Sequence, residues 1–331
     1  EVPQGAIRLN TDSQKLEFFA QDQWWEMATD VPTLQGGARG LRAGGQTAPA
    51  NARTATIDYI TIPTAGNATN FGSLTQIKFG PAGAGSNTRA VFMCGGTPVR
   101  LKEIDYVTFS STGNAQDFGD MTEERSAGGS GAHSNQTRGI VAGGSADATP
   151  VTNVMDYITI ASTGNGTDFG DLPTALSGNG AAGSSTRMIM SGGDINASGS
   201  YTNAINFVTM GTTGNSVDFG DLMSAANSYA VSNSIRYVCV GNSSPATLIQ
   251  NMIISSLGNT YKFGDLATST QGIIFGCSDP VRGVWGVLDG NTSSNIMEYM
   301  SFQTEGTAVD FGDLTQTVRN SGGTSNAHGG L

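Results

Sequence analysis

Pairs of acidic residues bracket a Phe-Gly dipeptide at four places in this sequence, and their type and spacing suggest chemistry. The pairs are Asp117 and Asp120, Asp168 and Asp171, Asp218 and Asp221, and Asp310 and Asp313. Two carboxylates can act as an acid and a base or as metal ligands. A calcium loop, however, draws several carboxylate and carbonyl oxygens to one ion, and two acids supply too few. We therefore expect a structural role for these aspartates.

The acidic motif recurs along the chain, which also favours structure over catalysis. The Phe residues of its copies are Phe71, Phe118, Phe169, Phe219, Phe263 and Phe311, at spacings of 47, 51, 50, 44 and 48 residues. A period of this length holds four short strands. An Arg recurs at nearly the same period, as Arg39, Arg89, Arg138, Arg187, Arg236 and Arg282. We expect each Arg to pair with an Asp of the motif.

Few other residues have the types that catalysis or metal binding needs. His133 and His328 lie at similar places in two repeats, and no third metal ligand accompanies them, so we expect them to line a channel. Cys94, Cys239 and Cys277 are expected to be free thiols, the first two at the ends of apolar runs. Neither a Ser-His-Asp nor a Cys-His arrangement is indicated. The sequence predicts no enzyme activity, no cofactor and no metal.

Each repeat contains three patterns typical of strands. Residues 155–162, "MDYITIAS", alternate polar with apolar side chains, and a Gly-Asn turn leads into the Phe-Gly motif. An apolar strand that begins with Arg and ends with Gly-Gly comes before them, as in "RGIVAGG" from Arg138. The fourth segment, such as "GNGAAGSST", carries almost only small side chains, which suits strands that converge on a central axis.

The two ends of the repeat region predict how the sheets close. The first repeat begins at Arg39 without a small-residue strand, whereas residues 317–330 contain such a strand without a repeat of its own. The final strand should therefore complete the first sheet. We expect an all-β chain with a six-bladed β-propeller at 34–331. Residues 1–33 should form a short β-meander, with Trp24 and Trp25 as docking or oligomerisation residues.

The composition argues against two classes of partner. The net charge is −11, and the 16 Lys and Arg residues are scattered, so we expect no nucleic-acid binding. No apolar run approaches the roughly 20 residues of a membrane span, so we expect no membrane insertion.

The order of these strands resembles the kelch-type propeller repeat, with Phe where that family commonly has Trp in the fourth strand. The segment "IRLNTDSQKLEFF" from Ile7 and the "DYITIAS" type of repeat also resemble structural proteins of tailed, marine-type bacteriophages. This second resemblance implies a non-enzymatic virion protein of the tail-fibre, head-fibre or decoration type. It would assemble in the host cytoplasm, with other virion proteins or copies of itself as partners.

The connection after Gly-Gly differs most between repeats and should lie on one face, where binding specificity is usually built. Its candidate binding residues are Arg100, Lys102, Asp194, Asn196, Tyr201 and Asn291. A host-surface glycan or protein is the expected ligand. Two alternatives remain open: a secreted or extracellular kelch-like glycan- or protein-binding module that is not part of a virion, and a propeller glycosidase.

Overall fold

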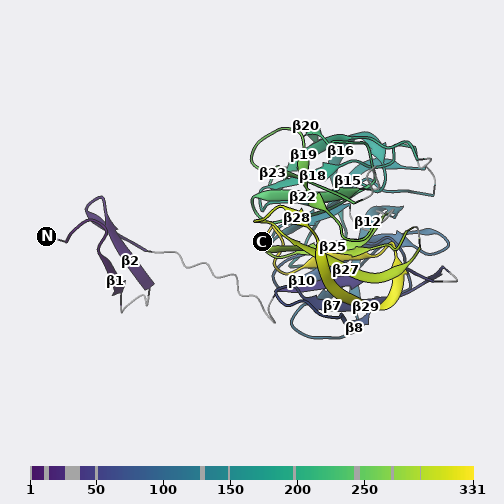
Figure 1. The fold of residues 1–331 in the computed structure, drawn as a ribbon, viewed down its shortest axis with the longest axis horizontal. Coiled ribbons are helices and arrows are strands. Elements are labelled where there is room, and N and C mark those ends of the chain that lie inside the picture. The colour runs from purple at the N-terminus through teal and green to yellow at the C-terminus, as the bar shows by residue number, and fades with distance from the viewer. Residues whose placement is uncertain are drawn as a thin grey trace. The chain divides into compact units, whose positions relative to one another are not determined.

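The computed structural model describes residues 2–10, 15–26, 38–48, 51–126, 131–147, 150–196, 199–241, 247–269, 272–290 and 292–331. The described part of the chain contains β-strands and no helix, so the chain is all-β as predicted. Contacts divide it into two compact units, Glu1–Thr33 and Leu34–Leu331 (Figure 1).

The N-terminal unit is the predicted meander. It is an antiparallel sheet of β1 (Ile7–Asn10), β2 (Lys15–Ala20) and β3 (Gln23–Glu26), in that order. Three short strands provide little core. One face is held by Trp24, which packs edge-on against Phe19 at 5.3 Å and lies under the Arg8 guanidinium at 4.1 Å.

The second unit contains six sheets, each with four strands that follow one another from the innermost to the outermost. Sheet 1 has β30 (Gly322–Ser325), β4 (Arg39–Ala43), β7 (Thr56–Thr61) and β8 (Thr69–Ser73). Sheet 2 has β9 (Ala82–Gly85), β10 (Arg89–Gly96), β11 (Arg100–Thr108) and β12 (Gln116–Arg125). Sheet 3 has β13 (Ala132–Ser134), β14 (Arg138–Ala142), β15 (Thr152–Thr159) and β16 (Thr167–Leu176).

The last three sheets repeat this order and gain strands from their neighbours. Sheet 4 has β17 (Gly180–Gly183), β18 (Arg187–Ser191), β19 (Ala204–Thr209) and β20 (Val217–Asp221). Sheet 5 has β21 (Ser228–Ser232), β22 (Arg236–Gly241), β23 (Leu248–Ile253), β24 (Tyr261–Asp265) and the added β28 (Gly306–Thr307). Sheet 6 has β25 (Ile273–Ser278), β26 (Arg282–Val287), β27 (Ser294–Ser301), β29 (Val309–Arg319) and the added β5 (Gln46–Thr47) and β6 (Ala52–Arg53).

The final strand pairs with the strand that begins at Arg39, as the sequence predicts. β30 runs antiparallel to β4, with Gly322 opposite Ala43 and Ser325 opposite Gly40. At the outer side of the same seam, β29 lies beside β8 (Figure 1). The two ends of the repeat region are therefore joined by backbone hydrogen bonds, which leaves neither β4 nor β30 as an unpaired edge there.

The innermost strands are built from small residues because they approach one another closely. Each inner strand contacts the next, in the order β9, β13, β17, β21, β25 and β30, and β30 contacts β9. A Cβ atom added at Gly83 would lie 2.3 Å from the carbonyl oxygen of Gly323. The predicted reason for the small side chains, backbone proximity, is confirmed for this pair.

The Gly-Asn turn of each repeat is fastened to the Phe-Gly motif of the sheet before it. Gly113 N donates to Phe71 O at 2.8 Å, and Asn114 Oδ1 accepts from Ser73 N at 3.1 Å. The same pair of contacts joins sheet 6 to sheet 1, where Gly66 N donates to Phe311 O and Asp313 N donates to Asn67 Oδ1. Between sheets 5 and 6 the contact is made by β24 and β28. We call these contacts the inter-sheet clasp.

The recurring arginines do not pair with the acids of the motif, and that prediction is wrong. Each guanidinium lies over an aromatic ring of its own sheet, as Arg39 lies 4.8 Å from the Tyr59 centroid. Five of them donate through Nη1 to a carbonyl oxygen in the next sheet: Arg39 to Phe109, Arg89 to Ile160, Arg138 to Met210, Arg187 to Ile254 and Arg282 to Ile62. Arg236 instead donates to Asn251 Oδ1 of its own sheet. A carbonyl is preferred because the strand directs the side chain toward the neighbouring sheet and not toward the exposed rim.

Buried ion pairs support the third strand of sheets 1 to 3. They are Arg42–Asp58, Lys78–Asp105 at 2.7 Å and Arg125–Asp156 at 2.5 Å, and each of these side chains is at most 1% exposed. A threonine from the preceding sheet also donates to each acid, as Thr122 does to Asp156 at 2.7 Å. Buried charge is tolerated here because each carboxylate has both a cation and a hydroxyl.

Candidate functional site

The paired acids that opened the sequence analysis belong to the inter-sheet clasp. The second acid of each pair offers its backbone N–H to the Asn of the next turn, as Asp120 N does to Asn165 Oδ1 at 3.1 Å. The first acid, such as Asp117 or Asp168, is exposed. Among the described residues there is no group of three or more His, Cys, Asp or Glu placed to hold a metal ion.

The connection after Gly-Gly places Arg100 beside its neighbours on adjacent sheets. Arg100 N donates to Asp147 Oδ2 at 2.8 Å, so two of these connections are in contact. Its guanidinium lies 5.4 Å from the Phe79 centroid. Lys102 instead lies 3.5 Å from Asp120 on β12 and takes no part in this contact. Asn291 lies outside the described residues.

Asp194, Asn196 and Tyr201 belong to one folded loop. The Asp194 carboxylate accepts from Asn196 N at 3.1 Å and from Gly199 N at 2.8 Å. The backbone of Asp194 also bridges to those of Tyr201 and Ser177. Asp194 therefore shapes the loop through local hydrogen bonds, and the three residues are brought together as predicted.

A cavity of about 220 Å³ lies where the connections after Gly-Gly approach the inner strands. It is lined by Phe79, Ser126, Ser145, Ser177, Gly178, Asp194, Asn227, Tyr229 and Asn320. Of the residues singled out from the sequence, Asp194 alone contributes to this lining. Burial raises the pKa of the Tyr229 phenol to about 12, so it stays protonated at neutral pH.

The other lining residues were missed because they lie in the short connectors between sheets. Phe79, Ser126 and Ser177 occupy equivalent places just before an inner strand, and each bridges to the connection after Gly-Gly of its own sheet. Their available signal was this fixed place in the period combined with a change of residue type from one repeat to the next.

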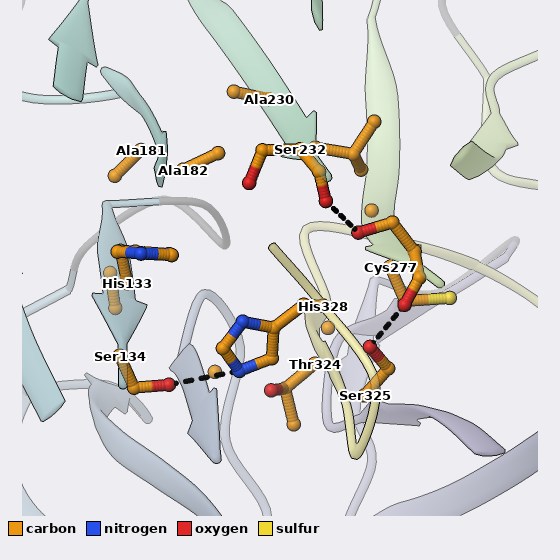
Figure 2. Close-up of a pocket in the computed structure, with 16 residues that line it drawn as sticks. His133, Ser134, Ala181, Ala182, Ala230, Ser232, Cys277, Thr324, Ser325 and His328 are labelled. Atoms are coloured by element: carbon orange, nitrogen blue, oxygen red, sulfur yellow. Dashed lines mark hydrogen bonds between the residues drawn. The ribbon is translucent and has the colours of Figure 1, made fainter. Parts of the chain in front are cut away.

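A second, smaller cavity of about 40 Å³ lies among the inner strands, and both histidines line it as predicted (Figure 2). Serine side chains link neighbouring strands here: Ser278 Oγ donates to Ser232 O at 2.8 Å, and Ser325 Oγ donates to Ser278 O at 2.5 Å. The cavity has room for one or more waters. Cys277 also lines it, and burial raises the pKa of its thiol above the usual range.

The two histidines are buried in neutral form within this cavity. His328 Nδ1 accepts from Gly330 N at 3.2 Å, so Nε2 carries the proton that faces Ser134 Oγ and Gly85 O, both at 3.1 Å. The His133 ring lies 5.5 Å away, centroid to centroid. Burial, and for His133 also the proximity of His328, lowers the pKa to about 3 for His133 and about 4 for His328.

We expect acid to destabilise the protein through these histidines. Their folded-state pKa values lie below the unfolded value of about 6.5, so their contribution to stability is complete above that pH and is lost as the pH falls toward 4. The loss is at most about 2 kcal/mol per histidine between pH 6.5 and 5. Urea unfolding at these two pH values should show a smaller difference for His328→Gln than for the wild type. An equal difference in both proteins would contradict the assignment.

Trp24 and Trp25 lie on opposite faces of the meander. Trp24 is covered by Phe19 and Arg8, which makes it a structural residue of this unit. Trp25 is 44% exposed and lies across the strands from Phe18, which is 37% exposed. Of the two predicted docking residues, Trp25 is the one that presents an apolar surface.

Comparison with known proteins adds no family assignment to these observations. No protein-family model matches the chain, and no curated protein matches it. Among the described residues, no helix is long and apolar enough to cross a membrane.

Proposed function

We propose that residues 34–331 form a six-bladed β-propeller of the kelch-like type, in which each of the six sheets is one blade. Two observations support this closure. The inter-sheet clasp recurs between sheet 6 and sheet 1, and the final strand β30 completes sheet 1. A propeller joined in this way is a rigid support whose loops can differ without loss of the fold.

The proposed function is that of a non-enzymatic virion structural protein, of the tail-fibre, head-fibre or decoration type, that presents one propeller face for binding. One observation carries it: the repeated residues are used between sheets, whereas the residues that differ between repeats gather around the cavity lined by Phe79 and Asp194. The ligand would be a host-surface glycan or protein, or another virion protein. Assembly in the host cytoplasm goes with this role.

The same face would serve a kelch-like binding module outside a virion equally well, because the cavity belongs to the propeller unit alone. This second candidate differs from the first in one consequence. A virion protein remains with particles at a fixed copy number, and a free module does not.

Two measurements test the proposal. Mass spectrometry of particles banded from cultures that produce the chain should find it at a constant ratio to the major particle protein. The purified chain should also compete with those particles for adsorption to host cells. The variant Asp194→Ala with Tyr201→Ala should compete several-fold less well, because the loop loses its internal hydrogen bonds and the face changes shape. Absence from the particles, together with no competition by the wild-type chain, would refute the proposal.

A further inference from the structure

The cations of the propeller unit have identifiable partners, with three exceptions. Six arginines lie over an aromatic ring of their own sheet, and five of these donate to a carbonyl of the next sheet. Three cations form the buried pairs with Asp58, Asp105 and Asp156. Lys102 and Lys262 pair with surface aspartates. The exceptions among the described residues are Arg53, Arg100 and Arg319.

These three arginines, which lie far apart in the sequence, are brought together in the fold. Arg319 on β29 is opposite Gln46 on β5, and Gln46 is opposite Arg53 on β6. Directly opposed residues point to the same side of a sheet, so Arg319 and Arg53 share one side about 10 Å apart. Arg53 and Arg100 lie 5.6 Å and 5.4 Å from the centroid of the same ring, Phe79.

Their charges are poorly neutralised by the protein. Neither Arg53 nor Arg319 has a carboxylate within 4.0 Å among the described residues, and Arg319 Nη2 donates only to the neutral Asn51 Oδ1. Arg100 has one carboxylate, that of Asp147, at 3.9 Å from Nε. The Nε atoms of all three are buried without a hydrogen-bond partner. A chain with a net charge of −11 thus gathers three guanidinium groups and one acid on one face.

We infer that Arg53, Arg100 and Arg319 form a binding site for an oxyanion: a carboxylate, sulfate or phosphate group. The planar guanidinium presents paired N–H donors that match such a group, and an oxyanion would supply the missing counter-charge. Phe79 holds two of the side chains in place before the ligand arrives, which lowers the entropy lost on binding.

The neighbouring cavity indicates what carries the oxyanion. Phe79 lines the cavity, and so does Asn320, the residue after Arg319. The lining further offers the hydroxyls of Ser126 and Ser177 and the amide of Asn227, whose Oδ1 has no hydrogen-bond partner. Hydroxyl and amide groups suit a hydroxyl-rich ring. The ligand class is therefore an acidic sugar, and this deepens the proposed function because it assigns the ligand of the same face.

Isothermal titration of the full chain tests the site with four probes: glucuronate, glucose 6-phosphate, glucose and inorganic phosphate. Wild type should bind at least one of the two charged sugars with a Kd of about 1 mM or tighter, and more tightly than glucose or phosphate. Arg53→Gln with Arg319→Gln should weaken this binding at least about tenfold. Lys262→Gln removes an exposed cation of sheet 5 and should leave binding unchanged. Matching thermal unfolding midpoints would establish that all three proteins are folded.

Each outcome decides the inference. Binding of glucuronate alone identifies a carboxylate ligand, and binding of glucose 6-phosphate alone identifies a phosphate ligand. Binding of neither charged sugar by wild type overturns the site, as does equal weakening by Lys262→Gln and the double variant. If the chain is nevertheless found in particles and competes for adsorption, the proposed function stands and only the ligand class is wrong. If sugar binding is found without particles or competition, the proposed function fails and the site remains.

Discussion

Asp156→Ala should lower the free energy of unfolding by about 3–5 kcal/mol, the expected cost of removing one partner from a buried ion pair. The change leaves the Arg125 guanidinium, which is fully buried, without its carboxylate at 2.5 Å. The Thr122 hydroxyl loses its acceptor as well. Burial raises the pKa of the Asp156 carboxyl, and the Arg125 charge and the Thr122 hydrogen bonds oppose that rise. Chemical denaturation at pH 7 measures the effect.

Two further variants separate the buried charge from other causes. Lys262→Ala breaks an exposed pair, since Lys262 is 55% exposed, and should change stability by no more than about 1 kcal/mol. Arg125→Met combined with Asp156→Leu removes both charges and should recover part of the loss, because no unpaired ion remains. A double variant as unstable as Asp156→Ala would show that the ion pair is not the cause.

Gly264→Ala should destabilise the protein by about 2–3 kcal/mol through overpacking at the clasp between sheets 5 and 6. The added Cβ would lie 1.8 Å from the carbonyl oxygen of Gly306, and backbone cannot move aside as a flexible side chain can. Gly264 has no positive φ, so the cost arises from contact and not from backbone strain. Thermal unfolding of the variant and the wild type measures it.

The matched control is Gly211→Ala, which adds a methyl group in open space without a positive φ. Its expected effect has the opposite sign, a gain of about 0.4–1 kcal/mol, because alanine restricts the unfolded chain. If both alanine variants had the same stability, close packing at the clasp would not contribute as described.

The sequence by itself established the strands and their order within a repeat. Period-two alternation in "MDYITIAS", the Gly-Asn turn and the small residues before Arg138 are local signals, and each arises from the geometry of a single strand or turn. The pairing of β30 with β4 was also predictable, because a missing strand at one end and a surplus strand at the other allow few solutions. The face that bears Asp194 followed from strand alternation in the same way.

The tertiary structure decided which partners lie across sheets. A repeated Arg and a repeated Asp suggest an ion pair, yet Arg39 reaches a carbonyl of the next sheet, because the distance between sheets does not follow from sequence spacing. For the same reason, the cations described as scattered in the sequence include Arg53, Arg100 and Arg319, which meet around Phe79. Sequence periodicity determines what each sheet contains, whereas side-chain contacts between sheets depend on their packing and exist only once the sheets are assembled.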